Sequence, residues 1–184
     1  MTYKTHLSAG ILFSTLYFAK VTDLSVSPLV FILIVLFSIL GSSTPDLDTP
    51  SGGLWQKIPA GSILSRVVRP IFIGGHRHLS HSFLGLGLFS LLFLFLIKII
   101  LQDHSSYIHL VTTAFVVGYL SHLFADMFTE KGVPLLFPFD YHFGIPPAPF
   151  EKVRIKTGRW FENIVIYPLV NIAAIFLIYK LFIR

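Results

Sequence analysis

Four separate segments of this 184-residue chain carry histidine and aspartate in positions suited to metal binding. The chain has no cysteine, so neither disulfides nor thiolate ligands are available and any metal must be held by imidazole nitrogen and carboxylate oxygen. Such ligands suit a divalent ion, zinc first, with manganese or magnesium as alternatives. The candidate ligands are His6, Asp46, Asp48, His76, His81, His122 and Asp126.

The spacing within two of these segments supports that chemistry. His122 and Asp126 are four residues apart, so on a helix they project from one side and serve as two ligands, or as a ligand and its orienting carboxylate. The alternative for this pair is a helix-capping hydrogen bond. Asp46 and Asp48 follow Pro45 in a predicted turn, where aspartate commonly forms turns or caps helices. Metal binding is favoured for them only because the other candidate segments carry histidine.

Residues 76–82 place three imidazoles and one guanidinium directly before a long apolar run. Ser80 or Ser82 is suited to cap the helix that follows. The positive end of that helix, together with Arg77, would then hold an anion such as phosphate. The alternative is a basic patch for lipid headgroups, which accounts for Arg77 but not for the histidines.

The composition is that of a membrane protein. Hydrophobic residues make up 54% of the chain, charged residues only 12%, and the mean hydropathy is +0.76. Soluble domains carry roughly 25% charged residues, so the bilayer is the expected solvent. The net charge of +5 could suggest nucleic acid, but nothing resembles a nucleic-acid-binding module, and cytoplasmic loops and anionic lipids explain the charge instead.

Five apolar runs predict an all-α, polytopic membrane protein with a single domain over residues 1–184. We expect about five transmembrane helices (four to five, because Pro168 interrupts the last run and that run could be re-entrant). The runs are too long, and lack the alternation, expected of strands. They cover residues 7–19, 28–41, 83–101, 108–128 and 163–183. No cleavable signal peptide is evident, so these segments would direct insertion.

Two long polar connections, residues 42–82 and 129–162, separate the runs. With five spans they lie on one face, together with the N-terminus. Within the first connection, residues 54–58 and 63–69 alternate apolar and basic side chains. They predict either a helix lying at the interface, with Trp55 at headgroup level, or an ordinary loop packed on the helix ends.

The basic residues predict which face this is. Ten of the fourteen lysines and arginines fall on the side of the long connections, which favours the cytoplasm of a cell (inner) membrane. These ten are Lys4, Lys57, Arg66, Arg69, Arg77, Lys131, Lys152, Arg154, Lys156 and Arg159; the others are Lys20, Lys98, Lys180 and Arg184. All the candidate ligands fall on the same face at a similar depth.

The remaining titratable residues are weaker candidates. His104 and His109 lie near the opposite face, so they cannot join the cluster. His142 lies on the expected side, in an aromatic and proline-rich stretch, where a structural role is favoured. Glu130 and Asp140 are further candidates for a base.

At these motifs the chain resembles the YdjM-type family of small membrane-bound proteins, which are described as metal-dependent hydrolases. The resemblance covers most of the chain. It implies metal binding more strongly than any reaction, and family members often carry glycine at the position of His78, which counts against His78 as a ligand. The motifs are Thr5-His6, Pro45-Asp46-Leu47-Asp48, His76-Arg77 with His81-Ser82, and His122-x-x-x-Asp126 followed by Thr129, Gly132 and Pro138.

These observations lead to one leading hypothesis, a hydrolase that binds one to three divalent ions and cleaves a phosphoester of a lipid or lipid-linked substrate at the cytoplasmic face. Asp46 or Asp48 would be the general base, Arg77 would offset negative charge, and Arg77 and Ser82 would contact substrate. Membrane lipids are the expected partners, and the oligomeric state is left open. The alternatives are a metal transporter and a metal-binding scaffold without hydrolytic activity.

Overall fold

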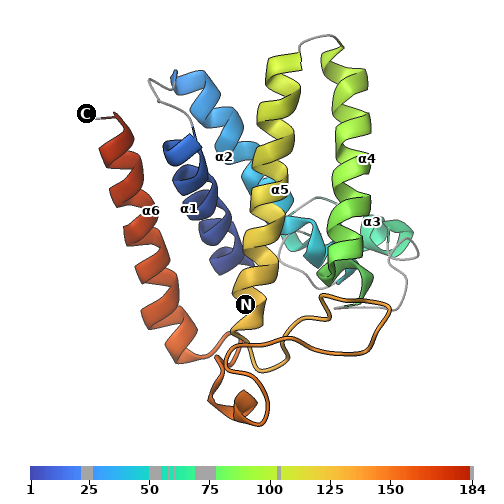
Figure 1. Cartoon of the computed structure of the whole chain (residues 1–184), viewed down its shortest axis with the longest axis vertical. Coiled ribbons are helices and arrows are strands. Elements are labelled where there is room, and N and C mark those ends of the chain that lie inside the picture. The colour runs from blue at the N-terminus through green and yellow to red at the C-terminus, as the bar shows by residue number, and fades with distance from the viewer. Residues whose placement is uncertain are drawn as a thin grey trace.

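The computed structural model describes residues 1–21, 27–49, 55–57, 59, 61–68, 78–102 and 105–182. Long helices run alongside one another in it, and the chain direction alternates from each to the next (Figure 1). They are α1 (Tyr3–Val21), α2 (Pro28–Ser43), α4 (Phe83–Leu101), α5 (Ser105–Met127) and α6 (Tyr167–Phe182). The described residues form no β-strand, only isolated bridges, so the predicted all-α class is confirmed.

Four helical segments are long and apolar enough to cross a membrane, within the predicted four to five. They are Pro28–Asp48, Phe83–Leu101, Ser106–Met127 and Glu162–Phe182. Only 6% of the last span and 11% of the second are buried in the protein, against 56% of the third, which makes α5 the central helix. The apolar side chains that α4 and α6 turn outward need lipid around them, so this is an integral membrane protein.

The helix α1 lies within the same bundle and packs against α2, α5 and α6. Its sequence is less apolar because it carries polar side chains that the bundle buries, among them Thr5, Ser14 and Thr15. The sequence predicted its start at residue 7, whereas the helix begins at Tyr3. The extra turn brings His6 into the helix, where neighbouring elements bury it.

Glycines allow the central helices to approach closely. A Cβ atom on Gly41 of α2 would lie 2.0 Å from the carbonyl oxygen of Phe115, and one on Gly118 of α5 would lie 2.2 Å from that of Ser38. Small residues at such crossings are the usual means by which membrane helices pack backbone to backbone. The contact fixes α2 against α5 over the half of the bundle that leads to the histidine cluster.

The described parts of both long connections lie at the end of the bundle where the N-terminus is found, and the C-terminus lies at the opposite end (Figure 1). The first contains the helix α3 (Gly61–Val68), so a helix is confirmed for that part, and its place at the membrane interface stays a prediction. Trp55, however, is 8% exposed and donates its indole N–H to the carbonyl oxygen of Leu47 at 3.1 Å. Trp55 therefore packs within the protein, as the loop alternative predicted.

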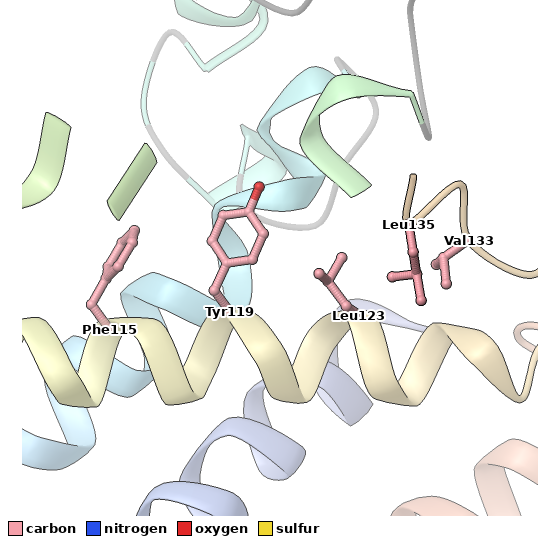
Figure 2. Close-up of a cluster of buried hydrophobic side chains, with 5 residues drawn as sticks. All are labelled: Phe115, Tyr119, Leu123, Val133 and Leu135. Carbon is pink, nitrogen blue, oxygen red and sulfur yellow. The ribbon is translucent and has the colours of Figure 1, made fainter. Parts of the chain in front are cut away.

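The second connection is folded against α5 by an apolar cluster. Phe115, Tyr119 and Leu123 line one side of the helix, and Val133 and Leu135 of the connection continue the row (Figure 2). Backbone hydrogen bonds of 2.8 Å in both directions join Val133 to Phe143 and close the loop. This packing holds the connection beside the last turns of α5, where the site lies.

Candidate metal centre

Segments far apart in sequence meet at the loop end of the bundle. The contributing elements are the first turns of α1, the 3₁₀ turns η1 (Pro45–Asp48) and η4 (Leu79–His81), and the last turns of α5. Their side chains form two overlapping groups, and within each the ligand atoms lie within 4.8 Å of one another. The groups are His6, His122 and Asp126, and Asp46, His81 and His122. Five of the seven predicted ligands are thus brought together.

Two imidazole nitrogens and two carboxylate oxygens lie close together. The Nε2 atoms of His81 and His122 are 3.2 Å apart, and Asp46 Oδ1 lies 3.8 Å from each. Asp126 Oδ2 lies 3.7 Å from the first nitrogen and 4.0 Å from the second. Ligand atoms of a tetrahedral zinc site, with bonds of about 2.0–2.1 Å, are roughly 3.3 Å apart. The arrangement therefore fits one ion after adjustments of a few tenths of an ångström.

The other oxygen of Asp126 faces a second imidazole. His6 Nε2 is 3.3 Å from Asp126 Oδ1, the His6 ring stacks on His122 at 3.6 Å, and the terminal ammonium of Met1 also contacts that oxygen. His6 is 1% exposed, yet among the described residues neither ring nitrogen has a hydrogen-bond partner. Buried polar atoms rarely lack a hydrogen-bond partner. A role as a metal ligand is one explanation for the buried imidazole of His6.

The two groups cannot both use His122, because a single imidazole nitrogen binds one ion. Asp126, in contrast, has one oxygen toward each group and could serve two ions. The donor set of nitrogen and carboxylate oxygen, in which the buried His6 imidazole makes no hydrogen bond to any described residue, fits zinc or a similar divalent ion.

The backbone of α2 orients His122. Its Nδ1 atom lies 2.7 Å from the carbonyl oxygen of Ser42, and a carbonyl can only accept, so Nδ1 carries the proton. The Nε2 lone pair is thereby directed at the cluster, as in most histidine metal ligands. The close α2–α5 contact at Gly41 and Gly118 sets this hydrogen bond.

A chain of hydrogen bonds lies behind His81. Its Nδ1 atom is 3.0 Å from Ser80 Oγ, which donates to Asp48 Oδ2 at 2.6 Å. Asp48 Oδ1 accepts a further bond of 2.8 Å from the Thr49 hydroxyl. Asp48, predicted as a ligand and base, thus lies on the Nδ1 side of His81, where a carboxylate orients the ring and raises its basicity.

Two supporting residues escaped the sequence analysis. Tyr119 donates a 2.5 Å hydrogen bond to the carbonyl oxygen of Ser80 and so fixes the turn that carries His81. The available signal was its position three residues before His122, which places both on one face of α5. Ser80 was considered only as a helix cap, whereas Ser82 takes that role by accepting from Gly85 N at 3.0 Å.

A buried glutamate fixes the start of α1. Glu162, at 0% exposure, accepts hydrogen bonds from Thr2 N (2.6 Å), Thr2 Oγ1 (2.9 Å), Thr5 Oγ1 (2.7 Å) and Gly158 N (2.7 Å). These donors join the first turn of α1 to the segment that enters α6. His6 follows Thr5 directly, so the same network positions its ring. No sequence pattern predicts this role, because Glu162 is the last residue of a long polar connection, where a glutamate is expected to face water.

Comparison with known proteins places the chain in a family. The sequence profile described as "YdjM inner membrane protein" matches residues 1–183. The chain belongs to the YdjM family. It is 30% identical over 182 residues to "Uncharacterized protein YvsG" of Bacillus subtilis (strain 168), which covers 99% of this chain and 97% of that protein.

Two further relatives carry the family's name. "Inner membrane protein YdjM" of Escherichia coli (strain K12) and its namesake from Shigella flexneri are each 37% identical over 118 residues. The match covers 61% of this chain and 53% of each relative, so the chain spans about half of their length. No solved structure matches. The resemblance stated from the motifs is confirmed, and these YdjM relatives are inner membrane proteins by name.

The structure does not describe every predicted residue. His76 and Arg77, with His104, fall outside the described residues, so their roles stay predictions. Ser82 is buried and its hydroxyl donates to Leu79 O at 2.7 Å while capping α4, which disfavours contact with a substrate.

The weaker histidines are placed apart from the groups as well. His142 is partly exposed and lies 3.6 Å from the exposed carboxylate of Asp140. His78 is half-buried, with its ring 6.2 Å from that of Phe137. His109 is exposed near the start of α5, at the end of the bundle opposite the cluster.

A water-facing cavity opens beside the cluster. It has a volume of about 500 Å³ and reaches Asp46, the one member of the two groups that is only partly buried. Its other walls come from Met1 and from the two ends of the second connection. The lining residues are Met1, Asp46, Glu130, Lys131, Lys156, Thr157 and Arg159.

Proposed function

We propose that this member of the YdjM family is a metal-dependent hydrolase that cleaves a phosphoester of a lipid or lipid-linked substrate at the cytoplasmic face of the membrane. One observation carries the proposal: Asp46 and Asp126 each direct an oxygen at the Nε2 atoms of His81 and His122, at distances of 3.7–4.0 Å, next to a cavity open to water. Structural zinc sites are closed, whereas catalytic ones keep a position open to solvent.

The chemistry follows from the ligands and their neighbours. A divalent ion held here would make a water molecule nucleophilic near neutral pH and polarise a phosphoryl oxygen. Asp46 lines the cavity and is the favoured general base, because Asp48 already accepts hydrogen bonds from Ser80 and Thr49. In that role Asp46 is not a metal ligand, so His81, His122 and Asp126 would hold the ion and its fourth position would be left for water. As the water oxygen bonds to phosphorus, its proton passes to Asp46 and the ester P–O bond breaks. The electron pair of that bond stays with the departing alcohol oxygen, which takes the proton back from Asp46. Arg77 stays a proposed partner for the phosphoryl oxygens.

A groove open to the membrane supports a lipid substrate. It has a volume of about 560 Å³, is lined almost entirely by apolar side chains, and runs between α1 and α5. One end reaches Phe83 and Met127, the neighbours in sequence of Ser82 and Asp126. A substrate with an acyl or prenyl chain could rest there while its polar part meets the site. The residues of α1 and α5 that line it are Phe13, Leu16, Tyr17, Lys20, Val117, Leu120, Leu123, Phe124 and Met127.

The position of the ligands disfavours the transporter alternative. His6 and Asp126 lie within four residues of a helix end, and Asp46 and His81 belong to turns just outside α2 and α4. Transporters hold their ions near the middle of the bilayer, between broken helices. The scaffold alternative predicts that the cluster is dispensable, and only an activity assay separates it from an enzyme.

The test uses purified, zinc-loaded protein and a panel of lipid phosphoesters. Asp46→Asn should lower turnover about a hundredfold or more, the usual contribution of a general base. Asp140→Asn removes an exposed carboxylate of the second connection and is the control. Zinc content is measured for each variant, to separate loss of metal from loss of the base. Wild-type protein that binds zinc and hydrolyses no member of the panel, or an active Asp46→Asn, would contradict the proposal.

A further inference from the structure

The cavity beside Asp46 is lined by an unusual number of cationic side chains. Lys131 follows the end of α5, and Lys156 and Arg159 precede the start of α6. Thr157 adds a hydroxyl group to the same wall. Three basic side chains and a hydroxyl around one cavity of about 500 Å³ are the donors with which proteins bind phosphate.

The acidic residues of the cavity do not cancel this charge. Glu130 lies 3.6 Å from Lys156 Nζ, so that lysine is paired, and Asp46 belongs to the metal group. Within the part of the chain that the structure describes, no carboxylate lies within 4.0 Å of the charged groups of Lys131 or Arg159. Two cations therefore face the cavity without an acidic partner, and an anion would supply one.

The backbone holds these cations in place. Ile155 N donates to Phe128 O at 2.9 Å and Glu130 N to Ile155 O at 3.2 Å, so the two ends of the second connection lie side by side. Gly158 has a φ of +75°, which turns the chain so that its N–H reaches Glu162. Lys131 and Arg159 thus approach the cavity from adjacent segments of fixed backbone.

We propose that this cavity is a phosphate subsite, in which Lys131, Arg159 and Thr157 bind the non-ester oxygens of a phosphate group. The subsite rests on the proposed function for its role, because it places the phosphorus next to Asp46 and the metal group. It narrows the substrate class to compounds with a terminal, doubly charged phosphate. A metal ion and the phosphate then attract each other, so zinc should tighten phosphate binding, and phosphate should tighten zinc binding by the same factor.

The test measures binding before any turnover. Zinc-loaded protein in detergent is titrated with inorganic phosphate and, separately, with a short-chain phosphatidic acid. Lys131→Ala and Arg159→Ala should each weaken binding about tenfold, because each removes a charge-assisted hydrogen bond. Lys131→Arg should retain most of the affinity. Lys152→Ala removes an exposed lysine of the same connection that does not line the cavity, and should bind as wild type does.

The outcomes separate this subsite from the proposed reaction. If Lys131→Ala and Arg159→Ala weaken the binding of both probes equally, the subsite binds free phosphate. If they weaken the binding of phosphatidic acid alone, the subsite binds a lipid headgroup. Either result supports the inference. Unchanged affinity for both probes in Lys131→Ala and Arg159→Ala, with unchanged KM where turnover is seen, would overturn it. Binding that depends on these cations in a protein without turnover would instead count against the hydrolase and leave the subsite standing.

Discussion

At the scale of single residues, His122 is the member of the cluster on which most contacts depend. It belongs to both ligand groups, stacks on His6, and receives its orientation from the carbonyl oxygen of Ser42. We expect His122→Ala to abolish stoichiometric zinc binding, measured by elemental analysis of purified protein. His109→Ala, which removes an exposed histidine of the same helix, should leave the zinc content unchanged. Equal zinc in the two variants would argue against a metal centre here.

The hydrogen bonds on the Nδ1 side of His81 predict a smaller loss of zinc binding than His122→Ala. Ser80→Ala breaks the link from His81 to Asp48 without touching a ligand atom of either group. Loss of such an orienting partner usually lowers metal affinity 10- to 100-fold, and we expect roughly that range. Competition with a chromogenic chelator measures it, with Ser90→Ala of α4 as the control serine. An affinity unchanged by Ser80→Ala would mean that packing alone positions the His81 ring.

At the scale of elements, the α2–α5 crossing decides whether the cluster forms. A side chain on Gly118 would meet the backbone of Ser38 at 2.2 Å, so the helices must separate to admit it. We expect Gly118→Leu to lower the free energy of unfolding by about 1–3 kcal/mol, the usual cost of an overpacked core, and to reduce the zinc content. Gly87→Leu is the matched control, because nothing lies within 4 Å of that position. Thermal unfolding measures the stability and elemental analysis measures the zinc content. Equal stability and equal zinc content in Gly118→Leu and Gly87→Leu would contradict the role of the α2–α5 crossing.

The helices and the ligands differ in how far the sequence predicts them. The apolar run at residues 83–101 predicts α4 to the residue, because Ser82 caps its start and the apolar side chains end with it. The i, i+4 spacing of His122 and Asp126 likewise predicts their shared face. By contrast, no local sequence pattern predicts that Ser80 links Asp48 to the Nδ1 atom of His81 by hydrogen bonds. Nor does any local pattern predict the hydrogen bond from Thr5 to Glu162. Those contacts depend on how separate segments pack, which spacing within one segment does not record.

At the scale of the whole molecule, the two long connections and the cluster share one end of the bundle, and the basic residues favour the cytoplasm for that end (Figure 1). The chain has no cysteine, so single cysteines report orientation without background. In intact cells, a membrane-impermeant maleimide should leave Asp140→Cys, an exposed position of the second connection, unlabelled. Ser106→Cys, exposed at the opposite end of α5, should react. Permeabilised cells should label both, which controls for access. Labelling of Asp140→Cys from outside, with Ser106→Cys protected, would invert the topology and move the proposed substrate to the other leaflet.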